Sequence, residues 1–135
     1  MFGGYDWLLD SIGSEDYWAD VGVDVAASKI SQFDSLSWTK LESALVVKSG
    51  VWRGRCAESL GDSNDKRALR ILLVLLKAEE ESVVIHAIES IESIFLAGYI
   101  FDRPQAMHAL SKGFEGRSRT LKLMTATLAK KLSEQ

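Results

Sequence analysis

Residues 52–94 read WRGRCAESLGDSNDKRALRILLVLLKAEEESVVIHAIESIESI, and this stretch decides the fold class of the chain. Residues 56–60 (CAESL) return at 87–91 (AIESI), 31 residues later, a distance typical of one helix–turn–helix repeat. Apolar residues recur every three or four positions on both sides of a polar turn, which is the spacing of amphipathic helices. The stretch therefore predicts an all-α fold of stacked helical hairpins, a scaffold whose usual work is binding.

The length and composition of the chain agree with that prediction. We expect the 135 residues to form one domain, and the one proline favours long helices. The one cysteine, Cys56, allows no internal disulfide, which suits a reducing compartment. The N-terminus lacks the pattern of a signal peptide, and the longest apolar run, 71–76, is too short to span a bilayer. We therefore expect a cytoplasmic protein without a membrane partner.

Charge is distributed unevenly along the chain. The formal net charge is −3, but residues 1–35 carry −6 and residues 103–135 carry +5. Such asymmetry indicates a charged partner surface. The alternative interpretation is that the two oppositely charged ends attract each other in the fold.

The periodicity of apolar residues places the helices. It predicts helices at about 1–13, 15–34, 37–48, 51–60, 65–77, 82–97, 103–113 and 117–133. The predicted N-caps include Ser14, Ser37 and either Asn64 or Asp65, and the predicted C-terminal stops include Gly61 and Gly98. The helix at 65–77 is apolar nearly all round, so it is either central or carries a second apolar face that could dimerise.

The segment 15–34 has the weakest helical pattern. As a helix, it would turn one apolar face inward, formed by Trp18, Val21, Val25 and Ile30. The β-branched residues at 21, 23 and 25 alternate with Gly22 and Asp24, so a short strand is the alternative there.

The repeat at 52–84 resembles the short form of the HEAT repeat, an armadillo-like helical hairpin. The residues that carry the resemblance are Trp52 and Arg53 at the aliphatic–Arg position, Cys56 and Ala57 at the small pair, Ser59, Leu60 and Gly61 at Ala-Leu-Gly, and Asp65, Ala68, Leu69, Leu72, Leu73 and Leu76 in the following helix. In the next unit Val83 and Val84 replace the aliphatic–Arg pair. The resemblance implies a right-handed α-solenoid at 36–135, behind an irregular acidic N-terminal cap at 1–35.

The chain also resembles the immunity proteins of bacterial toxin–immunity pairs in its size, acidity and lack of catalytic motifs. That resemblance implies neutralisation of a cognate toxin by direct binding. The alternatives are a HEAT-like adaptor in a larger complex, or a nucleic-acid-binding module that uses basic residues of the C-terminal helix, within 117–131.

Residues able to support catalysis or metal binding are few. His86 and His108 fall on different predicted helices without metal-ligand spacing, and we interpret both as solvated. His86, Glu89 and Ser90 would share an exposed polar face. Cys56 falls on an apolar helix stripe and is interpreted as a core residue, from which Arg55 should point away. We therefore expect no enzyme, metal or cofactor; an enzyme built on such repeats is the least favoured alternative.

Acidic and aromatic residues supply the candidate partner-binding set. Its members are Asp16, Tyr17, Trp18, Asp20 and Asp24 in the N-terminal third, and Asp62, Glu79, Glu80 and Glu89 in the repeats. Aromatic anchors among charged residues are typical of tight interfaces, and acidic surfaces attract basic partners. The set predicts binding of a basic toxin domain. The alternative is that Trp18 packs on the first repeat while the acids are merely solvated. The sequence does not determine the oligomeric state.

Overall fold

The computed structural model describes residues 1–99, 102–112, 114 and 116–134, and within these ranges it contains helices and no strand. The elements are α1 (Phe2–Ser11), α2 (Glu15–Tyr17), the π-helical turn η1 (Trp18–Gly22), α3 (Val23–Ile30), α4 (Ser35–Ala44), α5 (Gly50–Ser59), α6 (Lys66–Leu75), α7 (Glu81–Leu96), α8 (Arg103–Ser111) and α9 (Arg119–Ser133). The all-α prediction is confirmed. The alternative of a short strand around 21–25 is wrong, because those residues lie in η1 and α3.

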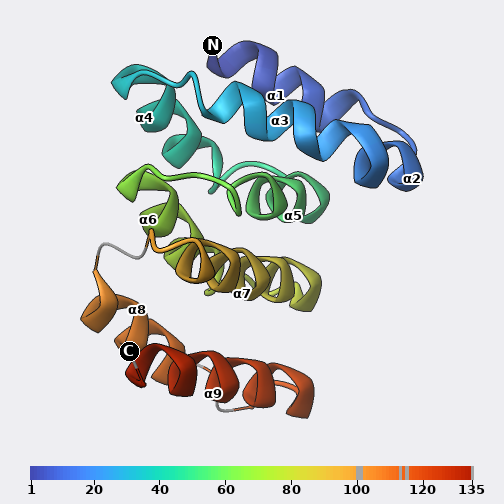
Figure 1. Cartoon of the computed structure of the whole chain (residues 1–135). Coiled ribbons are helices and arrows are strands. Elements are labelled where there is room, and N and C mark those ends of the chain that lie inside the picture. The colour runs from blue at the N-terminus through green and yellow to red at the C-terminus, as the bar shows by residue number, and fades with distance from the viewer. Residues whose placement is uncertain (100–101, 113, 115, 135) are drawn as a thin grey trace.

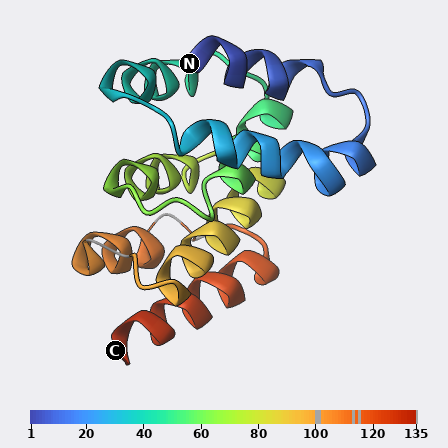
Figure 2. The ribbon, with the colours of Figure 1, turned by 45° about the horizontal axis from the view of Figure 1, so that its top comes forward.

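The helices stack in two rows from the N-terminal end to the C-terminal end (Figure 1). In one row α3, α5, α7 and α9 each pack on the next, while α4, α6 and α8 form the other row (Figures 1 and 2). Helix α1 closes the N-terminal end against α3, α4 and α5. The acidic and basic ends of the chain therefore lie at opposite ends of the stack, and the interpretation that they attract each other is wrong.

Side-chain caps fix where most of these helices begin. Ser14 accepts a backbone N–H at the start of α2, as predicted. At the start of α6 the N–H is accepted by Asp65, one of the two predicted candidates, and not by Asn64. Helix α4 is different, because Asp34 and not Ser37 is its N-cap. The Ser37 hydroxyl donates to Asp34 at 2.7 Å and is buried, so Ser37 supports the cap from inside the helix.

Two glycines predicted to end helices have different roles. Gly98 has φ +86°, and the following N–H of Tyr99 reaches back to the Ile94 carbonyl at 2.9 Å, which is a typical helix stop. Gly61 has no such φ. A Cβ on Gly61 would lie 3.1 Å from the Ser90 hydroxyl oxygen, so this glycine permits close approach of α5 and α7. Gly61 does follow α5, but the predicted reason for a glycine there, a positive φ that ends the helix, is wrong.

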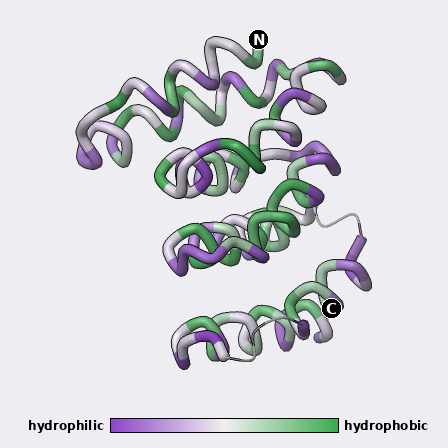
Figure 3. The backbone as a smooth tube through the Cα atoms, turned by 180° about the vertical axis from the view of Figure 1, so that it is seen from behind, coloured by the Kyte–Doolittle hydropathy of each residue, from purple (hydrophilic) through white to green (hydrophobic). Residues whose placement is uncertain are grey.

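The core runs through the middle of the stack, where the strongly hydrophobic positions of α6 and α7 lie (Figure 3). The buried residues of α6 are Ala68, Leu69, Ile71, Leu72, Leu73 and Leu75, followed by Leu76. Full burial of a Leu or Ile side chain contributes about 1.5–3 kcal/mol. Of the apolar residues of α6, Val74 is the exposed one, so this helix is central. No helix within the described residues is both long and apolar enough to cross a membrane.

Arg55 fastens the N-terminal helices to α5. Its guanidinium donates to the carbonyls of Leu9 at 2.9 Å and Ile12 at 2.7 Å, and to the Glu15 carboxylate at 2.8 Å. It also lies over the Trp18 ring, with Cζ 5.2 Å from the ring centroid. These carbonyls belong to the last turn and the C-cap of α1, where helix carbonyls lack partners and the helix dipole favours a cation. Arg55 is 4% exposed, so the expectation that it points away from the core is wrong.

Candidate partner-binding surface

Trp18 is a core residue of the N-terminal cap. In the π-turn the Val23 N–H bonds to the Trp18 carbonyl, five residues back. The indole is 1% exposed, and its Nε1 donates to Glu58 Oε1 on α5 at 3.3 Å. A Cβ on Gly22 would lie 2.8 Å from Cε3 of the ring, so only glycine fits there without rearrangement. The prediction that Trp18 binds a partner is therefore wrong. The alternative interpretation, in which Trp18 packs on the first repeat, is confirmed.

The inward face of this segment also differs from the predicted one. The residues that turn inward are Trp18, Gly22, Ala26 and Ile30, each four positions after the last. Val21 and Val25 are instead exposed. The prediction failed because it assigned valines to the core by hydropathy, whereas the close fit of Gly22 and Ala26 turns the valines to solvent.

The three aspartates of the cap remain on the surface. Asp16, Asp20 and Asp24 recur every four residues and are exposed. Within the described residues none of them makes an ion pair or a side-chain hydrogen bond, so their charges are not neutralised by the fold. Val21 and Val25 lie one position after Asp20 and Asp24, and this places apolar side chains beside the carboxylates. The result is a mixed acidic and apolar surface.

A hollow with two exposed aromatic side chains lies between α1 and α2. Trp7 is 69% exposed and Tyr17 is 53% exposed. Both line a hollow of about 540 Å³, together with Leu8, Ser11, Ile12, Gly13 and Ser14. Tyr17 belongs to the predicted partner-binding set, whereas Trp7 does not. The available signal was its place between the charged Asp6 and Asp10, off the stripe formed by the buried Tyr5 and Leu9.

The acidic residues predicted in the repeats do not join this surface as one group. Glu80 lies beside Gly50 at the start of α5, where it forms an ion pair with Arg53 at 2.7 Å. A backbone hydrogen bond lowers the pKa of the Glu80 carboxyl most; burial acts against it, and the hydrogen bond and charge of Arg53 lower the pKa further. Asp62 follows the other end of α5, and Glu79 precedes α7; both are exposed. The structure therefore separates Asp62 from Glu79 and Glu80 by the length of a helix.

Glu89 belongs to a small polar cluster on the α5–α7 side. Its carboxylate lies 3.3 Å from His86 Nδ1, and His86 Nε2 lies 3.6 Å from Glu58 Oε1. The same Glu58 oxygen accepts the Trp18 indole N–H, so the cluster links η1, α5 and α7. Glu58 was not predicted as a functional residue. Ser90 is buried and donates to the Ala57 carbonyl at 2.6 Å, so its expected place on an exposed face is wrong.

Two further predictions concern reactive and basic residues. Cys56 is buried, and burial raises its pKa to about 12, so the core interpretation is confirmed and the thiol is un-ionised near neutral pH. Two of the basic C-terminal residues are engaged within the fold. Arg117 donates to the carbonyls of Ala78 and Glu79, and Lys131 pairs with Glu92 at 2.7 Å.

No protein family, curated protein or solved structure matches this chain. Among the residues that the structure describes, no group of three or more His, Cys, Asp or Glu side chains is arranged to hold a metal ion.

Proposed function

We propose that the chain is a protein-binding α-solenoid, with right-handed HEAT-like hairpins at 36–135 behind the acidic cap at 1–35. Three features of the hairpins support this. The helices stack in two rows (Figure 1), the Arg53–Glu80 ion pair joins the start of α5 to the start of α7, and Asp65 caps the helix after the polar turn. Each hairpin buries its apolar stripe on its neighbours, which leaves the outer surfaces available for a partner.

We further propose that the cap binds a basic protein domain, as an immunity protein binds its cognate toxin. The observation that carries this proposal is the cap surface itself: the unpaired Asp16, Asp20 and Asp24, with Trp7 and Tyr17 exposed around a hollow. Large aromatic side chains provide most of the binding energy in many interfaces. Unpaired acids accelerate association with a basic partner, and contribute little to the fold.

The mechanism of neutralisation would be occlusion. The aspartates would meet cationic side chains that a nuclease or similar toxin uses to hold its substrate, while Trp7 and Tyr17 enter an apolar recess on the same face. No catalytic group of the immunity protein takes part. The proposal includes a cytoplasmic location, because a nuclease-like toxin acts in the cytoplasm and the immunity protein must bind it there. An adaptor in a larger complex would use the same surface for an endogenous partner.

The test is co-expression of this chain in a bacterial host with the C-terminal domain encoded by the adjacent upstream gene. The proposal expects rescue of growth and a stable complex. The triple variant Asp16→Lys, Asp20→Lys, Asp24→Lys should weaken the complex about 100-fold, mostly by slowing association. Trp7→Ala should weaken it by roughly 2 kcal/mol, mostly by faster dissociation.

A matched control is the triple variant Asp62→Lys, Glu79→Lys, Glu134→Lys, which makes the same change in net charge at exposed sites in the repeats and C-terminal region. It should keep most of the affinity. Equal losses in the two triple variants would show that the partner recognises net charge or the acidic residues predicted in the repeats, and not the cap in particular. Absence of any complex with the neighbouring domain would overturn the immunity proposal.

A further inference from the structure

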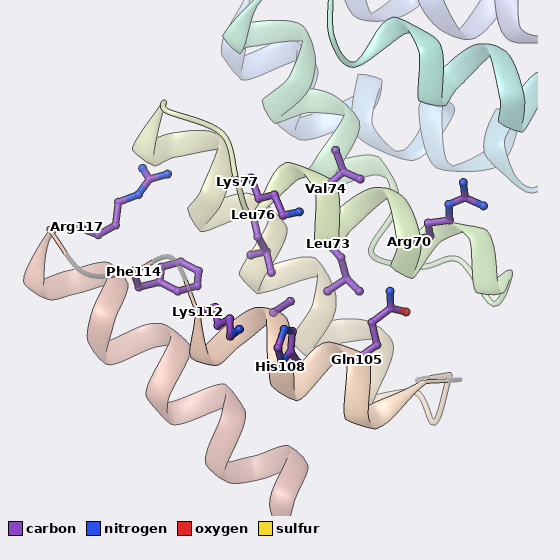
Figure 4. Close-up of a pocket in the computed structure, with 11 residues that line it drawn as sticks. Arg70, Leu73, Val74, Leu76, Lys77, Gln105, His108, Lys112, Phe114 and Arg117 are labelled. Atoms are coloured by element: carbon purple, nitrogen blue, oxygen red, sulfur yellow. The ribbon is translucent and has the colours of Figure 1, made fainter.

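A groove of about 620 Å³ lies between α6 and α8 (Figure 4). Its α6 wall is formed by Arg70, Leu73, Val74 and Lys77, and its α8 wall by Gln105, His108, Ala109 and Lys112. Within the helices the lining residues are spaced i, i+3 and i+4, so each wall is one helix face; Lys77 lies in the turn after α6, and Lys112 is the residue that follows α8. Figure 4 shows Arg70 and Gln105 nearer one end of the groove and Lys77 and Lys112 nearer the other, so the two walls run alongside each other.

The groove is basic on both sides. No acidic residue is among its described lining residues. Lys77, His108 and Lys112 are exposed, and none of them is ion-paired within the described part of the chain. Since these walls carry charge of the same sign, no ion pair can join them, and an anionic ligand between them would relieve the repulsion.

The neighbouring gap, between α4 and α6, shows the opposite arrangement. Arg70 reaches Glu42 on α4 at 2.9 Å, and Arg67 lies over the Trp38 ring at 5.4 Å. Those side chains bridge the two helices from within the chain. Among the lining residues that the structure describes, no ion pair bridges the α6 wall to the α8 wall, although Arg117 fixes one end of the groove by its bonds to the α6–α7 turn.

The base of the groove is apolar. Leu73, Leu76 and Phe114 are largely buried at its base, and Val74 is exposed at its edge. With the residues that follow α6 and α8, each wall is about as long as two helical turns, about 10 Å. Phe114 is buried, so it does not offer the exposed ring on which a nucleic-acid base would stack. A ligand that fits must combine an apolar stripe with flanking negative charge over about two turns.

We propose that this groove binds an acidic amphipathic helix of a protein partner. Apolar side chains at i, i+3 or i+4, and i+7 of that helix would contact Leu73, Val74 and Ala109, as in other helix-in-groove complexes. Its flanking carboxylates would meet Lys77 and Lys112. This site is opposite in charge to the cap surface and independent of it.

The test uses three synthetic peptides of about four helical turns, and measures binding by fluorescence anisotropy. One carries a leucine stripe with glutamates beside it, the second replaces the glutamates by lysines, and the third replaces the leucines by alanines. The acidic leucine peptide should bind at least about tenfold more tightly than either control, a difference of about 1.4 kcal/mol. Equal binding of all three would overturn the proposal, as would absence of binding.

The double variant Lys77→Glu, Lys112→Glu should bind the acidic leucine peptide at least tenfold more weakly than the parent protein, and so should Val74→Asp. All three residues are exposed, so the fold should persist, which circular dichroism checks. Lys40→Glu with Lys130→Glu makes the same charge change at exposed positions outside the groove and should leave binding unchanged.

The cap variant Asp16→Lys, Asp20→Lys, Asp24→Lys should still bind the acidic leucine peptide with unchanged affinity. This result distinguishes failure of the groove proposal from failure of the proposed function. The site would instead be a nucleic-acid site if single-stranded RNA or duplex DNA bound more tightly than the acidic peptide and was lost in the groove variant. Unchanged peptide binding in the groove variant would place the contact elsewhere and overturn the proposal.

Discussion

The substitution Arg55→Ala should be among the most destabilising single changes in this chain. The Arg55 side chain ties the α1–α2 turn, Glu15 and the Trp18 ring to α5. Removal of the guanidinium leaves two main-chain carbonyls, those of Leu9 and Ile12, without that donor. The stem of the side chain is lost as well, and it opens space beside a buried indole.

The magnitude follows from these contacts. An orphaned buried acceptor costs about 1–3 kcal/mol. The bond to the Leu9 carbonyl is buried and the bond to the Ile12 carbonyl is partly buried, so these two carbonyls account for most of the effect, the Leu9 carbonyl more than the Ile12 carbonyl. The cation–π contact with Trp18 adds about 0.5–2 kcal/mol. Glu15 is 75% exposed in its side chain, so that ion pair contributes at most about 1 kcal/mol. Because these terms are not additive, we expect a loss of about 3–5 kcal/mol, a large part of the stability of a domain of this size.

Urea unfolding followed by circular dichroism measures the loss of unfolding free energy, and amide hydrogen exchange shows which residues are destabilised. Exchange should accelerate most in residues 1–30, which Arg55 holds in place. Arg53→Ala is the matched control: Arg53 is two residues away and forms a half-exposed ion pair with Glu80, worth about 0–1 kcal/mol. A loss below about 1 kcal/mol for Arg55→Ala, or uniform acceleration of exchange, would refute the role assigned to Arg55.

Three further predictions concern two core positions and the N-cap residue of α6. The Cys56 thiol should resist a thiol reagent in the folded protein and react at once in urea, because burial raises its pKa to about 12; rapid native-state labelling would contradict its burial. Gly22→Ala should cost about 1–3 kcal/mol in urea unfolding, since its Cβ would meet the Trp18 ring, whereas the open Gly13→Ala should be near neutral. Hydrogen bonds from Arg67 lower the pKa of Asp65 in the folded protein. The ionised Asp65 therefore stabilises the fold fully at a pH above the ordinary aspartate pKa, and this stabilisation is lost as the pH falls through the lowered pKa of the folded state. Asp65→Asn should therefore be less stable than the parent at neutral pH, with a difference that shrinks in acid; a difference independent of pH would exclude this linkage.

The sequence predicted the local structure well because local structure depends on neighbouring residues. The helices, the caps at Ser14 and Asp65, the stop at Gly98 and the buried place of Cys56 all follow from three- and four-residue spacing and from cap chemistry. Asp34 displaced Ser37 as a cap because both residues can accept an N–H, and spacing does not choose between neighbouring candidates.

The sequence by itself therefore determined that the chain is helical, where most helices begin and end, and that acidic and basic residues gather toward opposite ends of the chain. Only the tertiary structure decided which faces meet. It buried Trp18 and Arg55, exposed Trp7, and placed α6 beside α8 with basic residues on both walls. Periodicity defines the faces of a single helix, but whether a face is covered depends on a neighbour distant in sequence. That is why most core stripes could be predicted, whereas the cap surface was predicted only in part, without Trp7, and the α6–α8 groove was not predicted at all.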